Sequence, residues 1–127
     1  MSDAYHLFRE GQKRLRGGMA AQATVPLERA KRLEPAKASI REALGIAYFR
    51  LARWQDAERE FRAIVEELSP TDHYAHYALG RALERLGRTA EANGHYKLAS
   101  SMDPTSEQYA SRILDLDAVD SDSDDHP

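Results

Sequence analysis

The chain of 127 residues contains no cysteine, so it can form neither a disulfide bond nor a metal site built on thiolates. It has no apolar run approaching the roughly 18 residues that a membrane-spanning helix needs, and its N-terminus lacks the basic-then-apolar order of a secretory signal. It also has no glycine-rich phosphate loop, and no serine or histidine lies in a recognisable nucleophile motif. These absences predict a cytoplasmic protein that is not an enzyme, binds no cofactor and has no membrane partner.

Charge is distributed unevenly along the chain. Residues 1–104 carry 17 basic and 14 acidic side chains, a net charge of +3, whereas residues 105–127 carry 1 and 7, a net charge of −6. The 14 arginines against 4 lysines, together with abundant alanine, suggest a bacterial protein from a GC-rich genome. Acids are interleaved with the arginines and the calculated pI is about 5.9. Nucleic-acid binding is therefore a distant third among the three functions considered below.

One spacing occurs three times in the sequence. Gly45 is followed twelve residues later by Ala57 and four residues after that by Phe61. The same intervals join Gly11, Ala23 and Leu27, and again Gly80, Ala92 and Tyr96. The copies are offset by 34 residues and then by 35, and each ends near a proline, at Pro35, Pro70 and Pro104. Such a period is typical of a solenoid built from stacked units.

The spacing resembles the tetratricopeptide repeat, a helix-turn-helix unit. The middle copy matches best and supplies Leu44, Gly45, Tyr48, Ala57, Phe61 and Pro70. The third copy supplies Leu79, Gly80, Ala92, Tyr96 and Pro104, and the first is the poorest match. The resemblance implies an all-α fold, a right-handed α-α superhelix of about seven helices. We expect three repeats within residues 1–104, at approximately 4–37, 38–72 and 73–106.

The helix boundaries follow from capping and apolar periodicity. We expect helices over 3–16, 19–33, 37–52, 54–68, 71–86 and 89–102. Ser69 and Pro70 are expected as N-cap and first residue of the fifth helix, and Asp103 and Pro104 as the start of a seventh. Residues 105–116 are then a capping helix that covers the last apolar surface. Residues 117–127 have five acids in eleven positions, which predicts a disordered acidic tail.

The resemblance also implies where a partner binds, because the first helix of each pair lines the concave side of such a superhelix. The inward-facing positions of this chain are Tyr5, Phe8, Gln12, Arg16, Glu42, Ile46, Phe49, Arg50, Tyr74, Tyr77, Arg81 and Arg85. Tyrosine and arginine are over-represented among binding hot spots, and arginine holds carboxylates in a bidentate fork. We therefore expect a protein-protein interaction module, an adaptor, scaffold or chaperone-like protein. Its partner would be a peptide or helical segment with acidic groups beside apolar or aromatic anchors.

A purely structural interpretation of the same residues remains open. Phe8, Ile46 and Phe49 could complete the packing between first helices, while the arginines could pair with Glu42 and Glu84. The protein could also be a self-association module that forms homo-oligomers, and the acidic tail could compete for the groove or serve only solubility.

Two specialised sites are not expected. Co-chaperones of this family hold a C-terminal carboxylate with lysine, asparagine and arginine residues. The corresponding places here are Phe8, Gln12, Ala43, Tyr74 and Ala78, and none keeps the required type. His73 and His76 are three residues apart on an expected helix, but no third metal ligand accompanies them.

Overall fold

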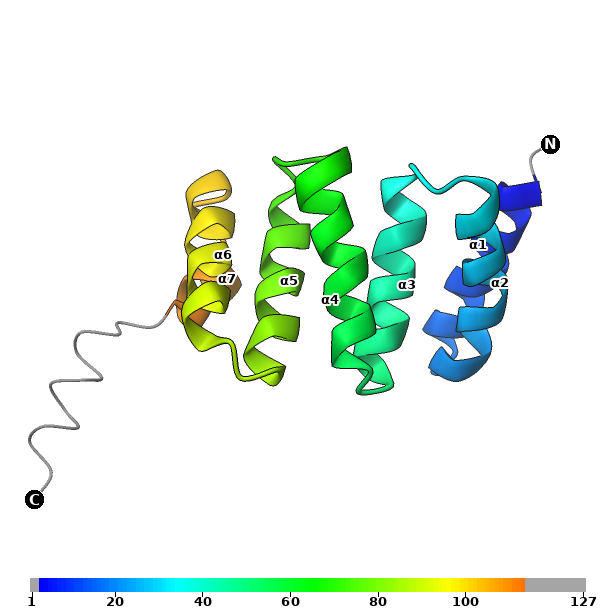
Figure 1. Cartoon of the computed structure of the whole chain (residues 1–127), viewed down its shortest axis with the longest axis horizontal. Coiled ribbons are helices and arrows are strands. Elements are labelled where there is room, and N and C mark those ends of the chain that lie inside the picture. Colours follow the sequence, from blue (N-terminus) through cyan, green and yellow to red (C-terminus); the bar gives the residue numbers. More distant parts are fainter. Residues whose placement is uncertain (1–2, 114–127) are drawn as a thin grey trace, which may run out of the picture.

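The computed structural model describes residues 3–113, which form a row of helices that pack each against the next (Figure 1). They are α1 (Asp3–Arg16), α2 (Ala20–Leu33), α3 (Ala38–Arg50), α4 (Trp54–Ala63), α5 (His73–Arg85), α6 (Thr89–Met102) and α7 (Glu107–Arg112). No strand occurs in this part of the chain, so the predicted all-α fold of about seven helices is confirmed. None of these helices is both long and apolar enough to cross a bilayer.

The repeated spacing brings a glycine of each first helix against a large side chain of the second helix. A Cβ atom added to Gly45 would lie 2.6 Å from Cζ of Phe61, and one added to Gly80 would lie 2.5 Å from Cε1 of Tyr96. Gly11 has the same relation to Leu27. Each pair of helices is therefore closed by a large side chain that lies where a Cβ would otherwise be.

The turn inside each pair contains one residue in the left-handed region of the backbone. These residues are Gly18, Ala52 and Gly87, with φ of 75°, 59° and 80°. They have the same offsets as the repeats, 34 and 35 residues. Ala52 has a Cβ atom, whereas the two glycines have none. The turn between α3 and α4 therefore carries backbone strain that the other two turns avoid.

The second pair of helices ends differently from the sequence prediction. A single helix is expected over 54–68, but the α-helix ends at Ala63 and continues as a π-helical turn, η1 (Ile64–Leu68). The amide of Ser69 donates to the carbonyl of Ile64 over 2.7 Å, which is the i to i+5 bond of a π turn. Because a π turn holds one extra residue, it absorbs the 35th residue of this repeat.

Two predicted helix starts are wrong by two to three residues. The N-cap of α5 is Asp72, whose side chain accepts from the amide of Ala75 over 3.0 Å, and the N-cap of α7 is Ser106, which accepts from Tyr109 over 3.2 Å. Asp103 instead accepts from Thr105. In both turns a capping side chain lies beyond the proline, so the proline belongs to the turn. The end of the predicted capping helix and the predicted tail lie outside the described residues.

Charges on the second helices connect one repeat to the next. The carboxylate of Glu60 on α4 is 4% exposed and accepts from Lys31 of α2 over 2.7 Å and from Arg41 of α3 over 3.3 Å. Between repeats two and three, Arg62 bonds Glu91 of α6 over 2.6 Å, and Glu58, one turn earlier on α4, also bonds Arg62 over 2.7 Å. The Lys31–Glu60 and Arg62–Glu91 pairs therefore join neighbouring repeats.

Glu60→Gln is expected to lower the free energy of unfolding by about 1–3 kcal/mol, because it leaves two partly buried cations without their carboxylate. Urea denaturation followed by circular dichroism measures the loss. The control is Glu10→Gln, which removes the exposed pair with Arg14 and should change stability by less than about 0.5 kcal/mol. Equal losses in the two variants would contradict the structural role of Glu60.

Candidate functional site

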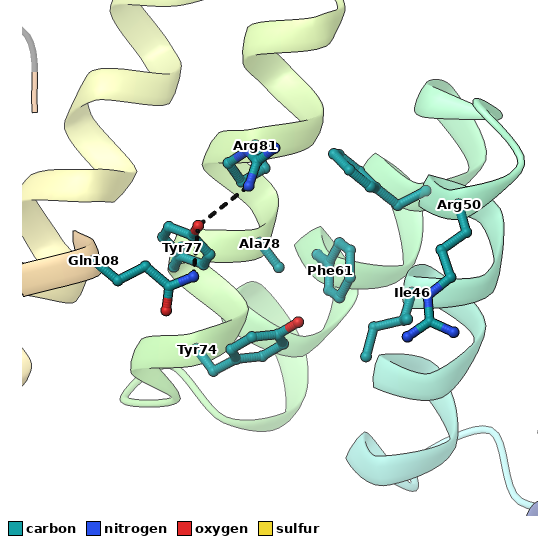
Figure 2. Close-up of a pocket in the computed structure, with 9 residues that line it drawn as sticks. Ile46, Arg50, Phe61, Tyr74, Tyr77, Ala78, Arg81 and Gln108 are labelled. Carbon is teal, nitrogen blue, oxygen red and sulfur yellow. Dashed lines mark hydrogen bonds between the residues drawn. The ribbon is translucent and has the colours of Figure 1, made fainter. Parts of the chain in front are cut away.

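A hollow of about 250 Å³ lies between α3 and α5 and is closed at one end by α7 (Figure 2). Its wall is formed by Ile46, Phe49, Arg50, Phe61, Tyr74, Tyr77, Ala78, Arg81 and Gln108. Phe61 reaches this hollow from α4 although its side chain is 2% exposed, and Tyr77 is 5% exposed. The floor is therefore apolar and aromatic, with polar atoms at the rim.

A second hollow, also of about 250 Å³, lies between α1 and α3. Its wall is formed by Phe8, Gln12, Leu15, Arg16, Ser39, Glu42, Ala43, Ile46 and Arg50. Ile46 and Arg50 belong to both hollows. The two hollows therefore adjoin each other along α1, α3 and α5, and we call them together the groove.

Four arginines of the first helices make no ion pair with any residue of the range 3–113: Arg16, Arg50 and Arg81 line the groove, and Arg85 lies on α5 outside both hollows. We call these four the groove arginines. Arg50 donates to the carbonyl of Leu15 over 2.8 Å, and the guanidinium of Arg81 lies 5.4 Å from the ring centre of Phe49. Arg85 lies 5.2 Å from the ring centre of Trp54. These contacts position the guanidinium groups without neutralising them.

The acids that could have neutralised the groove arginines have other surroundings. Glu84 accepts from the hydroxyl of Tyr96 over 2.8 Å and faces Arg112 at 3.9 Å. Glu42 forms no ion pair within the described part of the chain, and burial, followed by the charge of Asp72, raises the pKa of its carboxyl group. The interpretation in which the arginines pair with Glu42 and Glu84 is therefore not what the structure shows.

The hydroxyl group of Tyr77 accepts two hydrogen bonds at the rim of the groove. Arg81 donates to it over 3.2 Å and Gln108 over 3.0 Å, as the dashed lines in Figure 2 show. Both lone pairs of the oxygen are then occupied, while the proton has no acceptor among residues 3–113. An acceptor brought by a bound molecule would complete this arrangement beside the charge of Arg81.

The sequence profile of the tetratricopeptide repeat family matches residues 27–107, well over half of the chain. The chain belongs to the tetratricopeptide repeat family. The mouse (Mus musculus) Superkiller complex protein 3 is 31% identical over 95 residues. That match covers 75% of this chain but only 6% of the length of the mouse protein.

Solved tetratricopeptide repeat structures share the fold. The first such domain of Spaghetti (RPAP3), bound to the HSP90 peptide SRMEEVD, matches with a TM-score of 0.83 at 22% identity and covers 87% of both chains. MamA matches with a TM-score of 0.83 at 22% identity, covering 87% of this chain and 64% of MamA. The Arabidopsis OM64 domain has a TM-score of 0.82 at 20% identity, covering 86% and 89%.

Ten of the twelve residues predicted for the concave side line the groove. The other two lie outside both hollows: Tyr5 is 54% exposed near the start of α1, and Arg85 stacks on Trp54. Trp54 is itself partly exposed and contacts Phe49 edge to face, with ring centres 4.9 Å apart. The tetratricopeptide pattern did not reveal Gln108, because it comes from α7, outside the repeats.

Two histidines that the sequence places on one helix have different partners. His73 bonds the hydroxyl of Tyr109 over 2.8 Å, whereas Nδ1 of His76 lies 3.1 Å from Nδ1 of His95. Nε2 of His76 lies 2.8 Å from the carbonyl of Pro70 and must donate to it, so Nδ1 of a neutral His76 accepts the proton of His95. Within residues 3–113 no three metal-ligating side chains converge.

The His76–His95 pair predicts that acid destabilises the third repeat. Burial, then the charges of His76 and Arg62, lower the pKa of His95, while Glu91 and Glu66 oppose the shift. The unfolded chain therefore binds more protons below about pH 6.5, and the free energy of unfolding falls as pH falls. His95→Asn keeps a donor for His76 but cannot titrate.

Thermal melting measured between pH 7.5 and 5.0 tests this prediction. The decrease in melting temperature should be clearly smaller in His95→Asn than in the parent chain. His6→Asn, at an exposed position near the N-terminus, is the control and should keep the parental pH dependence. Identical profiles for the parent and His95→Asn would show that the pair contributes nothing.

Proposed function

We propose that the protein is a non-enzymatic interaction module that binds a segment of a partner protein in the groove. The observation that carries the proposal is the contrast in charge pairing. Arg62 on α4 and Arg88 at the N-cap of α6 are held by carboxylates, whereas the groove arginines have none within the described residues. Two adjoining hollows lined by apolar side chains and unneutralised guanidinium groups favour a ligand that carries carboxylates beside apolar side chains.

The groove offers such a ligand two kinds of contact. An apolar or aromatic side chain fits the hollow over Phe61 and beside Tyr74. A neighbouring carboxylate can accept from Arg81 and from the free proton of Tyr77, while Arg50 is available where the two hollows meet. Burial of the anchor supplies affinity, and the charged hydrogen bonds supply specificity.

Peptide binding by structural relatives supports this proposal. The matched domain of RPAP3 holds a peptide that ends in glutamate, valine and aspartate residues, and a second RPAP3 domain holds the HSP70 peptide SGPTIEEVD. The present chain has Phe8, Gln12, Ala43, Tyr74 and Ala78 where the family's carboxylate clamp is built. Its acids would therefore be bound by Arg50 and Arg81, at other positions of the same groove, without requiring a terminal carboxylate.

An array of octapeptides tests the proposal directly. Each peptide combines two or three acids with a leucine, valine or phenylalanine, and its control replaces every acid by the corresponding amide. Acidic peptides should be retained, their amide controls should not, and 0.5 M NaCl should weaken retention because exposed charges are screened. Equal retention of acidic, amide and lysine-containing peptides would contradict the proposal.

Glu42→Gln should tighten the best acidic peptide about two- to fivefold, because it removes one negative charge from the wall of the groove. The raised pKa of Glu42 has a related consequence. Protonation of its carboxyl should strengthen acidic-peptide binding as pH falls, and this dependence should be lost in the variant. Fluorescence anisotropy at pH 7.5 and 5.5 measures both effects, and unchanged affinity would exclude a groove site that includes Glu42.

Self-association is a second candidate function, favoured by apolar side chains at the two ends of the row of helices. Val25 and Leu33 on α2 are 63% and 56% exposed, and Leu98 and Met102 on α6 are 45% and 37% exposed. Figure 1 places these helices at opposite ends, so the surfaces could stack head to tail. Sedimentation velocity tests this candidate at protein concentrations from about 1 to about 100 micromolar, where weak self-association would be detected. If the groove is the main binding site, the protein should remain a monomer throughout this range.

A further inference from the structure

We infer that the acidic segment that follows α7, residues 114–127, is itself a ligand of the groove of the same chain. The inference rests on the proposed function and adds regulation to it. A partner would then bind in competition with a segment that the protein carries. Four observations support the inference: the path of α7, the pattern of the segment, its charge and its length.

Helix α7 packs against α6, and its side chains also contact α5. Gln108 of α7 bonds Tyr77, and Arg112, one turn further on, faces Glu84 at 3.9 Å. Ile113 packs against the core. The chain therefore leaves the described part of the structure next to the C-terminal half of α5, which carries Arg81 and Arg85.

The segment has the chemistry that the groove favours. It begins LDLDAVD, so that apolar residues alternate with acids, and residues 114–127 contain six aspartates and no lysine or arginine. The groove arginines have no carboxylate partner within residues 3–113, and the hollow beside them has an apolar floor. Leu114 or Leu116 can supply the anchor, while Asp115 and Asp117 supply the carboxylates.

The segment is also long enough. Fourteen residues span at most about 50 Å when extended and about 20 Å on average as a flexible chain. Neighbouring helices lie about 10 Å apart, so the path from α5 across α3 to α1 is about 20 Å. A tethered ligand acts at an effective concentration in the millimolar range, so even weak contacts compete with a free partner.

Paramagnetic relaxation in the full chain tests this arrangement. Because the sequence has no cysteine, Ser121→Cys gives a single site for a nitroxide label. Amide signals of groove residues such as Ile46, Ala78 and Arg81 should broaden, whereas those of Lys97 on α6 should not. The broadening should disappear in 0.5 M NaCl, because salt screens exposed charges. Broadening that is confined to α7, or equal on α2, α4 and α6, would overturn the inference.

Substitutions in the segment test whether binding to the groove depends on the positions of its acids or only on its net charge. Replacing Asp115, Asp117 and Asp120 by asparagine should abolish the broadening, and should tighten the best acidic octapeptide at least about threefold. Replacing Asp122, Asp124 and Asp125 changes the charge equally but leaves the apolar-flanked acids in place, and should have a smaller effect. Equal effects of the two triple variants would overturn the assignment of the apolar-flanked acids as the ligand.

Further outcomes show which molecule supplies the segment that occupies the groove, and whether the inference alone or also the proposed function fails. If nitroxide on one molecule broadens the groove signals of a second, isotope-labelled molecule to the same extent, the occupant belongs to another copy and the same-chain inference is wrong. If the octapeptide binds the parent and the asparagine variant equally, the segment does not occupy the groove, but the proposed function stands. If the octapeptide binds neither chain, both fail together.

Discussion

Gly80→Val is expected to destabilise the protein by about 3 kcal/mol, a large part of the roughly 5–15 kcal/mol that stabilises a small domain. The nearest atom to a Cβ at this position would be Cε1 of Tyr96, at only 2.5 Å. The ring cannot move aside easily, because Tyr96 is fully buried and its hydroxyl donates to Glu84 over 2.8 Å. Denaturation with urea should show the loss, together with reduced cooperativity of the third repeat.

Gly94→Ala is the matched control, since Gly94 lies inside α6 and an added Cβ would meet nothing within 4 Å. Alanine restricts the unfolded backbone and favours the helix, so this variant should gain about 0.5–1 kcal/mol. A loss of stability in Gly80→Val and a gain in Gly94→Ala would show that the repeat requires glycine where two helices approach closely, and not glycine in general. A loss at Gly94 as large as that at Gly80 would contradict this explanation.

The double variant Arg50→Glu, Arg81→Glu is expected to weaken the best acidic octapeptide at least about a hundredfold. Hydrogen bonds to charged groups contribute about 1.5–3 kcal/mol each, a tenfold change in affinity corresponds to about 1.4 kcal/mol, and the reversed charges also repel the peptide. Both arginines line the groove where the apolar anchor would bind. Fluorescence anisotropy with the labelled peptide measures the loss.

The control for charge is Arg59→Glu, Lys97→Glu, which makes the same change at exposed positions of α4 and α6. It should alter affinity by less than about threefold, because exposed charges far from the site are screened. Circular dichroism and melting must show that both double variants are folded, since Arg50 also donates to the carbonyl of Leu15. Equal losses of peptide affinity in the two double variants would show that net charge, and not the position of Arg50 and Arg81 in the groove, causes the loss.

The sequence predicts the fold well because each repeat is specified by steric rules that act locally. A small residue at Gly45 and a large one at Phe61 predict two helices in close contact, and three copies in phase predict the stack. The details that fail depend on competition between neighbouring groups. Asp72 and Ser106 cap their helices better than the residues before the prolines, and the π turn after Ala63 accommodates one extra residue.

The groove is predicted only in outline. The family pattern gives the face of each first helix, which is why most of the predicted residues line the two hollows. It could not show that Phe61 reaches the hollow from a second helix or that Gln108 closes one end. Nor could it decide whether the arginines are paired, because that depends on side-chain directions and on competing partners such as Tyr96 for Glu84.

Nuclear magnetic resonance titration of the isotope-labelled full chain with the best acidic octapeptide tests the central claim most directly. If the groove is the binding site, the largest amide shifts should lie on α1, α3 and α5, with Ile46, Tyr77 and Arg81 among them. The outer positions Arg59 and Lys97 should remain unchanged. Largest shifts on α2, α4 and α6, or no saturable shifts with any peptide of the array, would contradict the claim that the groove binds a partner segment.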